Sequence, residues 1–151
     1  MNFDLLTKEI KEHEGFRSIP YCDACSKNFR ECTCTPKLSG KLTVGYGWNL
    51  EGHPITEELA TVVLNHQIIE AYDDVSEYLK EVWDDLSDNR QRVLVNMRFN
   101  LGAKSFRTFV RTLRAVMVGR YEDAANSMLV SKWAKQVGQR AVYLAELMRS
   151  G

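Results

Sequence analysis

Apolar residues recur at helical spacing along most of the chain, beginning at the N-terminus. Leu6 and Ile10 lie about one helical turn apart among charged residues, which predicts an amphipathic helix. Asn2 or Asp4 is placed to cap the start of this helix, and Gly15 suits a position just past its end. We therefore expect a first helix that closes on a glutamate beside a glycine.

The same periodicity runs from residue 54 to the C-terminus and predicts helices only. Thr56 can cap a helix whose apolar spacing fits one long helix or two joined ones. Ser87 or Asp88 can cap the next helix, which stops at Gly102. Shorter helical segments follow at 105–119, 121–130 and 139–148. The first of these is predicted to bury Phe106, Phe109, Val110, Leu113 and Met117.

Residues 16–50 depart from the helical pattern. Prolines and glycines interrupt this region, and β-branched and aromatic residues stand between them. The run "KLTVGYGW" predicts a short strand with tight glycine turns. Together with the helices, it predicts an α+β fold in a single domain, 1–151. A small β-containing N-terminal lobe, about 1–55, is joined by a long helix to a larger helical C-terminal lobe, about 56–151.

Composition and charge narrow the function classes. The chain has 151 residues, of which 44% are hydrophobic and 26% charged, as in one globular domain. Its 20 basic and 20 acidic residues balance, so no basic surplus favours nucleic acid. No run of about 18 apolar residues predicts a membrane span, and the start lacks the features of a secretory signal. We expect a monomer, made in the cytoplasm, that binds neither nucleic acid nor membrane.

Glu14 and Asp23 are the first candidates for chemistry. Two carboxylates in one cleft can divide the work of general acid and general base in glycoside hydrolysis, if the acid has a raised pKa. The spacing alone is a weak signal, because the chain holds 20 acidic residues. Taken alone, Glu14 also fits a solvated helix end.

The order of residues around these carboxylates is more specific. In chain order they are Glu14 with Gly15, Tyr21, Asp23, Gly40 and the Thr-x-Gly-x-Gly run at 43–47. This order resembles the motif of the phage-type lysozymes, glycoside hydrolase family 24. The stretches "VNMRFNLG" (95–102) and "YEDAANSMLVSKWAKQVGQRA" (121–141) resemble landmarks of the same family. The resemblance covers nearly the whole chain and implies a lysozyme-like fold.

The resemblance also implies a role for each site residue. Glu14 would protonate the glycosidic oxygen. Asp23 would stabilise positive charge on the sugar, or orient a water together with Thr43. Arg140 matches the arginine that pairs with the catalytic glutamate, although by itself it also fits a surface charge. The separation of the two carboxyls decides between inversion and retention, which stay open, as does attack by the sugar's own hydroxyl in a lytic transglycosylase.

The chain departs from the family pattern in an insertion at 24–39, where the family has only a few residues. The four cysteines, Cys22, Cys25, Cys32 and Cys34, lie in and beside it. Their spacing, C-x2-C-x6-C-x-C, fits a tetrahedral structural zinc site, and it also allows two disulfides or free thiols. Synthesis in the cytoplasm favours thiols or metal, whereas release to the envelope favours disulfides. Either crosslink would hold Asp23 in place, and we expect no cofactor for catalysis.

The resemblance implies an endolysin that hydrolyses the bonds between N-acetylmuramic acid and N-acetylglucosamine in bacterial peptidoglycan. It would stay in the host cytoplasm until a holin or lysis releases it to the cell wall in the periplasm. The alternatives are a catalytically inactive glycan-binding module and a helical zinc-knuckle protein that binds protein or nucleic acid. Retention of Glu14, Asp23 and Thr43 disfavours the first, and balanced charge disfavours the second. We expect the helical lobe to fold independently from about Glu57 onward.

Overall fold

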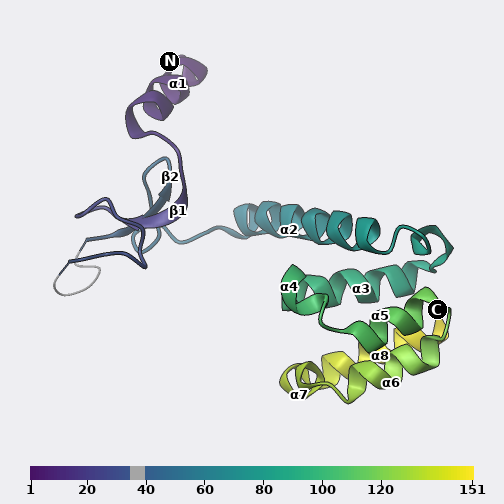
Figure 1. Ribbon diagram of the computed structural model, residues 1–151. Coiled ribbons are helices and arrows are strands. Elements are labelled where there is room, and N and C mark those ends of the chain that lie inside the picture. Colours follow the sequence, from purple (N-terminus) through teal and green to yellow (C-terminus); the bar gives the residue numbers. More distant parts are fainter. Residues whose placement is uncertain (35–39) are drawn as a thin grey trace. The chain divides into compact units, whose positions relative to one another are not determined.

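The computed structural model describes residues 1–34 and 40–151, which divide into two compact units, Met1–Ala60 and Thr61–Gly151 (Figure 1). In these residues the helices are α1 (Phe3–Glu14), α2 (Glu57–Tyr78), η1 (Trp83–Asp85), α3 (Asp88–Leu101), α4 (Ala103–Phe106), α5 (Val110–Met117), α6 (Tyr121–Leu129), α7 (Lys132–Val137) and α8 (Gln139–Ser150). The strands are β1 (Arg17–Cys22), β2 (Leu42–Gly45) and β3 (Trp48–Asn49). This is the predicted α+β fold. Residues 35–39, which belong to the predicted insertion, lie outside the described residues.

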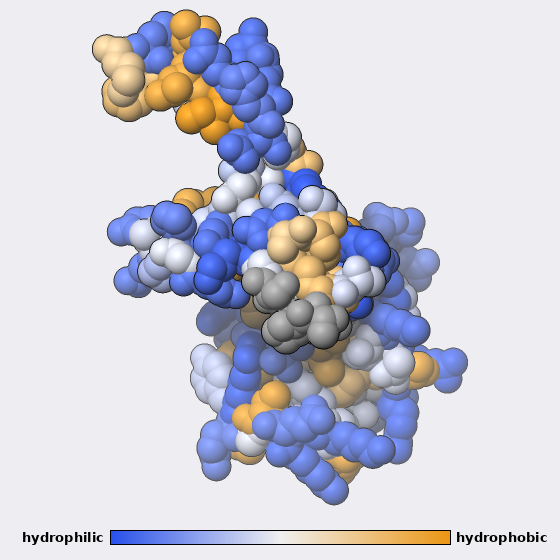
Figure 2. All heavy atoms as spheres, turned by 90° about the vertical axis from the view of Figure 1, so that its left-hand side faces the viewer, coloured by the Kyte–Doolittle hydropathy of each residue, from blue (hydrophilic) through white to orange (hydrophobic). Residues whose placement is uncertain are grey.

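The first helix forms as predicted, and its side chains are exposed. Asn2 Oδ1 accepts a hydrogen bond from the backbone N–H of Leu5 at 3.0 Å, so Asn2, not Asp4, is the cap. At the other end Gly15 has φ +66° and donates its N–H to the carbonyl of Lys11 at 3.1 Å. Figure 2 shows the apolar side chains of α1 gathered on the surface of the helix, and no residue of α1 is buried.

The sheet of the first unit is antiparallel, in the order β1-β2-β3. Thr43 stands at its centre, opposite Tyr21 of β1 and Asn49 of β3. The turn between β2 and β3 depends on glycine, because Gly45 and Gly47 have φ of +68° and +80°. The predicted strand with glycine turns is therefore confirmed.

A single long helix, α2, begins where Thr56 was expected to cap it. Thr56 Oγ1 accepts a hydrogen bond from the N–H of Leu59 at 3.4 Å. The pKa of the Glu58 carboxyl is lowered, first by its own backbone N–H and then by the Thr56 hydroxyl. The alternative of two joined helices is wrong. Among the described residues, no helix is both long and apolar enough to cross a bilayer.

The hydrophobic core lies in the second unit, around α3. Ser87 caps α3 by accepting the N–H of Arg90 at 3.3 Å, and the helix stops at Gly102 as predicted. Trp133 of α7 packs into this core and donates its indole N–H to Asn100 at 2.7 Å. The largest fully buried side chains of the unit are Leu79, Leu94, Met97, Phe106, Leu113, Met128 and Met148.

The segment 105–119 contains a break between two helices. α4 ends at Phe106, and α5 starts at Val110. Between them the hydroxyl of Thr108 donates to the carbonyl of Ser105 at 2.7 Å, and the backbone N–H of Thr108 donates to the same carbonyl at 3.1 Å. These bonds close a turn in place of continued helix, because they occupy a carbonyl that a longer helix would use.

This break changes which side chains of the segment face the core. Phe106 and Leu113 are buried, as predicted, and Phe109 is partly buried. The predicted burial of Val110 and Met117 is wrong, because they are 46% and 39% exposed. A continuous helical period does not hold across the turn, so positions after it rotate onto a different face.

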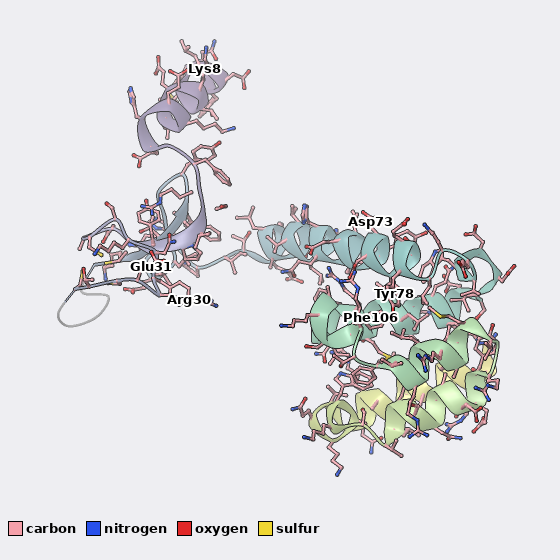
Figure 3. The ribbon with its side chains drawn as sticks, viewed as in Figure 1. Lys8, Arg30, Glu31, Asp73, Tyr78 and Phe106 are labelled. Atoms are coloured by element: carbon pink, nitrogen blue, oxygen red, sulfur yellow. The ribbon has the colours of Figure 1, made fainter. Side chains whose placement is uncertain are left out.

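An ion network that sequence patterns did not indicate ties α2 to α3 and α4. Arg98 is 12% exposed and contacts Asp74 at 2.9 Å and Glu70 at 3.1 Å. Arg107 contacts the other oxygen of Asp74. The hydrogen bond to Asp74 is the main cause that raises the pKa of Arg98 above its ordinary value. The neighbouring Asp73 points away from α3 (Figure 3).

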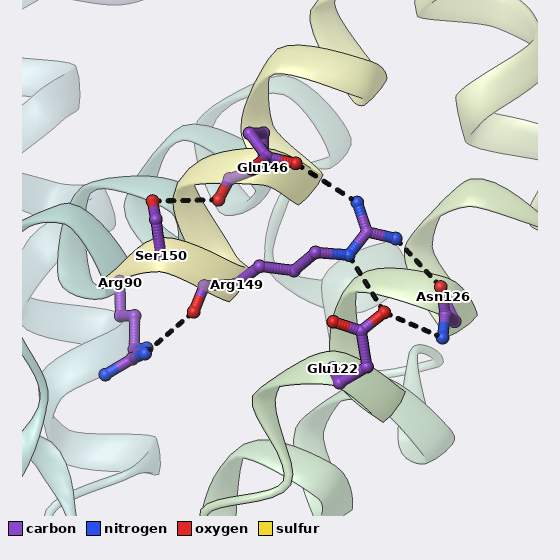
Figure 4. Close-up of polar contacts among 6 residues, drawn as sticks. All are labelled: Arg90, Glu122, Asn126, Glu146, Arg149 and Ser150. Carbon is purple, nitrogen blue, oxygen red and sulfur yellow. Dashed lines mark hydrogen bonds and ion pairs between the residues drawn. The ribbon is translucent and has the colours of Figure 1, made fainter.

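A second polar cluster ties the C-terminal helix to α6 and α3 (Figure 4). Arg149 donates from Nε to Glu122 at 3.0 Å and from Nη2 to Asn126 at 2.8 Å. The guanidinium of Arg90 donates to the carbonyls of Met148 and Arg149 at 3.0 and 3.1 Å. These contacts satisfy carbonyls at the end of α8 that have no partner within the helix.

Candidate functional site

Glu14 is the last residue of α1, and its carboxylate lies beside the turn that follows β2. A Cβ atom placed on Gly47 would stand 3.0 Å from Glu14 Oε2. Gly47 therefore has two reasons to lack a side chain: its φ of +80° and the close approach of this carboxylate. Glu14 and the glycine turn, which belong to the same sequence motif, therefore lie next to each other in the structure.

Asp23 directly follows β1 and is held by the chain that returns from the insertion. Its N–H donates to the carbonyl of Lys41 at 3.0 Å, and its Oδ1 accepts the N–H of Lys41 at 2.6 Å. Gly40 packs against the same group. A Cβ on Gly40 would lie 2.3 Å from Asp23 Oδ1 and 2.6 Å from the backbone nitrogen of Ala24. The two ends of the insertion therefore meet at Asp23.

Thr43 is 5% exposed and lies at the centre of the sheet. Its hydroxyl donates to the carbonyl of Lys41 at 3.3 Å. The same carbonyl accepts the backbone N–H of Asp23, and the N–H of Lys41 donates to the Asp23 carboxylate, so the backbone of Lys41 contacts both side chains of the predicted pair. The structure thus brings Asp23 and Thr43 together despite the insertion, at the start of β2, while Glu14 lies near the turn beyond its end.

Arg17, a residue that sequence reasoning did not assign, supports this region. The guanidinium of Arg17 stacks 3.8 Å over the ring of Tyr21 and donates to the carbonyl of Ser26 at 2.9 Å. These contacts tie the start of β1 to the insertion. The register of β1 with β2 shifts between Arg17 and Tyr21, so a regular strand period would not have located this contact.

Arg140 lies in the first turn of α8, in the second unit. Its Nε and Nη2 both donate to Asn96 Oδ1, at 3.0 and 2.6 Å. Asn96 stands beside Arg140 in a hollow lined also by Tyr72, Gln91 and Phe99. Sequence reasoning missed Asn96, although a polar residue between Val95 and Met97 was a signal. The pairing of Arg140 with Glu14 joins residues of different units and stays a prediction.

The four cysteines converge at the base of the insertion. Cys22, at the end of β1, is buried, and its Sγ lies 3.7 Å from Sγ of Cys34. Sγ of Cys25 lies 3.7 Å from Sγ of Cys32, and all four sulfurs are within 4.8 Å of one another. Sulfur is the donor atom that zinc prefers in closed structural sites. The donor set therefore fits a tetrahedral metal ion.

Comparison with known proteins gives a family match that extends over most of both units. The sequence model of the family described as phage lysozyme matches residues 11–149. The pre-baseplate central spike protein Gp5 of Enterobacteria phage T4 is 28% identical over 119 residues, 76% of this chain and 21% of that protein. The chain thus spans about a fifth of the length of that relative. Because the matched region includes most of the chain, from before Glu14 to α8, this protein belongs to the phage lysozyme family.

Proposed function

We propose that this protein hydrolyses the glycosidic bonds between N-acetylmuramic acid and N-acetylglucosamine in bacterial peptidoglycan. The observation that carries the proposal is the backbone of Lys41, whose N–H binds Asp23 and whose carbonyl binds Thr43 although sixteen residues separate Asp23 from Gly40. Family membership supports a lytic action on peptidoglycan, and this geometry supports a role for both side chains in it.

Glu14 is the proposed general acid. It is the last residue of α1, and its carboxylate stands beside Gly47 in the turn between β2 and β3. The proton of Glu14 passes to the glycosidic oxygen as the bond to the anomeric carbon breaks, and the leaving sugar departs as an alcohol. Positive charge then develops on the sugar that remains.

Asp23 and Thr43 are the proposed partners of that charge and of the attacking water. In the described residues, the oxygen of Asp23 that is hydrogen-bonded is Oδ1, which leaves Oδ2 to face the sugar or a water. The hydroxyl of Thr43 donates its proton to Lys41, so its oxygen is left as an acceptor. A water that donates to both groups is held for attack on the anomeric carbon, and its proton leaves to Asp23.

The proposed setting is lysis of the host cell. The protein stays in the host cytoplasm until a holin or lysis releases it, and it then acts on the cell wall in the periplasm. Two alternatives share the fold: a glycan-binding module without activity, and a lytic transglycosylase. Product ends separate them, because hydrolysis leaves a reducing sugar, whereas attack by the sugar's own hydroxyl leaves an anhydro end.

The test is loss of turbidity by outer-membrane-permeabilised bacteria, with mass spectrometry of the released sugars. We expect wild type to clear the suspension and release reducing ends. Glu14→Gln removes the proton donor and keeps the shape, so clearing should fall by roughly 100-fold or more. Glu9→Gln is the matched control, because Glu9 is an exposed carboxylate on the same helix.

Each other outcome overturns a distinct part of the proposal. Equal clearing by wild type and Glu14→Gln would show that the acid is another residue. Binding to purified peptidoglycan without clearing by wild type would indicate the inactive module. Anhydro ends would identify a transglycosylase.

A further inference from the structure

The first unit contains little that could hold it together by hydrophobic burial. Among residues 1–34 and 40–60, the buried side chains are those of Cys22 and Thr43. The sheet is three short strands, of which β3 has two residues. Units of this size with so small a core usually require disulfides or a metal ion. A cysteine cluster at the end of β1 is where such a crosslink would act.

The spacing of the sulfurs favours a shared ligand over disulfide pairs. Zinc binds each thiolate at about 2.3 Å in a tetrahedron, which places the sulfurs about 3.8 Å apart. The pairs Cys22–Cys34 and Cys25–Cys32 stand at 3.7 Å, and no two of the four sulfurs are more than 4.8 Å apart. Two disulfides need bonded partners at about 2.05 Å and give no reason for the two pairs to converge on one point.

The backbone around the cysteines is arranged as a closed turn. The N–H of Ser26 donates to the carbonyl of Cys22 at 2.8 Å, and the N–H of Cys22 donates to the carbonyl of Lys27 at 3.0 Å. Ser26 has φ +55°, a left-handed conformation that is uncommon outside glycine and bends the chain just after Cys25.

We propose that Cys22, Cys25, Cys32 and Cys34 bind one zinc ion as four thiolates. Each thiol releases its proton to solvent as the metal binds, so the site changes from four neutral thiols to a complex with a net charge of minus two. All four positions of the metal are filled by protein, so the zinc has no site for a reacting water and is structural.

The consequence for the active site is that zinc fixes the position of Asp23. Cys22 directly precedes Asp23, and the insertion also returns onto β1, where the N–H of Phe29 donates to the carbonyl of Pro20 at 3.1 Å. The bonds from Asp23 to Lys41 close the base of the loop on the other side. The zinc site would therefore hold the chain just before Asp23, and the backbone of Lys41 holds Asp23 itself. This consequence rests on the proposed function, whereas the metal site rests on the cysteines alone.

The metal site is tested on the full chain purified without a metal-affinity step. Elemental analysis should find one equivalent of zinc, and denaturing alkylation without reductant should add four groups to the intact mass. Replacement of the zinc by cobalt should give the visible absorption of a tetrahedral thiolate site. Cys25→Ser and Cys32→Ser should each lose most of the metal. The control is His66→Ala, which removes an exposed imidazole on α2 that is not part of the cluster and should keep the metal. An intact mass with no added alkyl groups would show two disulfides and would overturn the site. Four alkylated thiols in a protein with only traces of zinc would also overturn it.

A second measurement separates the metal site from the proposed function. Zinc is removed with a mercurial reagent and a chelator, and lysis is compared before removal, after removal and after zinc is restored. Loss of lysis on removal and its recovery on restoration support the positioning of Asp23. Full lysis by the zinc-free protein would overturn that positioning and leave the metal site intact. If the wild-type protein contained zinc but did not lyse cells, this result would contradict the proposed function and leave the metal site intact.

Discussion

Gly40 is the residue on which the position of Asp23 most directly depends. Any side chain at Gly40 would meet the Asp23 carboxylate and the backbone of Ala24 at distances that real Cβ atoms do not show. We predict that Gly40→Ala displaces Asp23 and lowers kcat/KM for peptidoglycan by about 100-fold, as expected when a reacting group is misplaced by about 1 Å. The measurement is the initial rate of turbidity loss.

Gly52→Ala is the control for Gly40→Ala, because it makes the same substitution at another glycine of the first unit. A Cβ on Gly52 would stand 3.2 Å from the side-chain nitrogen of Asn49, and it would meet neither backbone nor a residue of the proposed site. It should keep most of the activity. Equal rates for Gly40→Ala and wild type would show that the carboxylate of Asp23 moves freely or takes no part in the reaction. Circular dichroism should give the same helix content for all three proteins.

At the scale of elements, the ion network that joins α2 to α3 and to the residue after α4 is expected to contribute to the free energy of unfolding. Arg98 and Asp74 are 12% and 19% exposed, so removal of Asp74 leaves a largely buried guanidinium whose one ion-pair partner in the described part of the chain is the exposed Glu70. We predict that Asp74→Ala lowers the free energy of unfolding by roughly 2 kcal/mol, below the range for a fully buried pair. Denaturant unfolding followed by circular dichroism measures it.

Asp73→Ala is the matched control for this prediction. Asp73 is the neighbouring residue on the same helix, but it is exposed and points away from α3 (Figure 3). Its removal should change the free energy of unfolding by less than about 0.5 kcal/mol. If the two variants were equally stable, the network would contribute nothing beyond surface charge.

For the whole molecule, the division into two units predicts unequal stability. The core cluster runs from Val75 to Met148 and lies entirely in Thr61–Gly151. We predict that a fragment from Glu57 to the C-terminus folds alone, with a helical circular dichroism spectrum and a cooperative thermal transition. It should not lyse cells, because it lacks Glu14, Asp23 and Thr43. A random-coil spectrum would contradict the prediction.

Local features of the sequence determined most helix boundaries and the motif of the site. Asn2, Thr56 and Ser87 cap their helices through side-chain oxygens that reach only three residues ahead, so short-range pattern is enough to find them. The turn between β2 and β3 is similarly determined by two glycines with positive φ. The order of residues from Glu14 to the glycine turn identified the family.

The tertiary structure alone decided features that join residues far apart in the chain. The meeting of Asp23 with Lys41 crosses the insertion, the pairing of Asp74 with Arg98 joins two helices, and the four sulfurs converge from both ends of a loop. The break before Val110 also escaped the periodicity, because a side-chain bond to the backbone there stops the helix. Periodicity predicts which face of a helix is apolar, but a contact between distant residues is selected by packing and charge once the chain has folded.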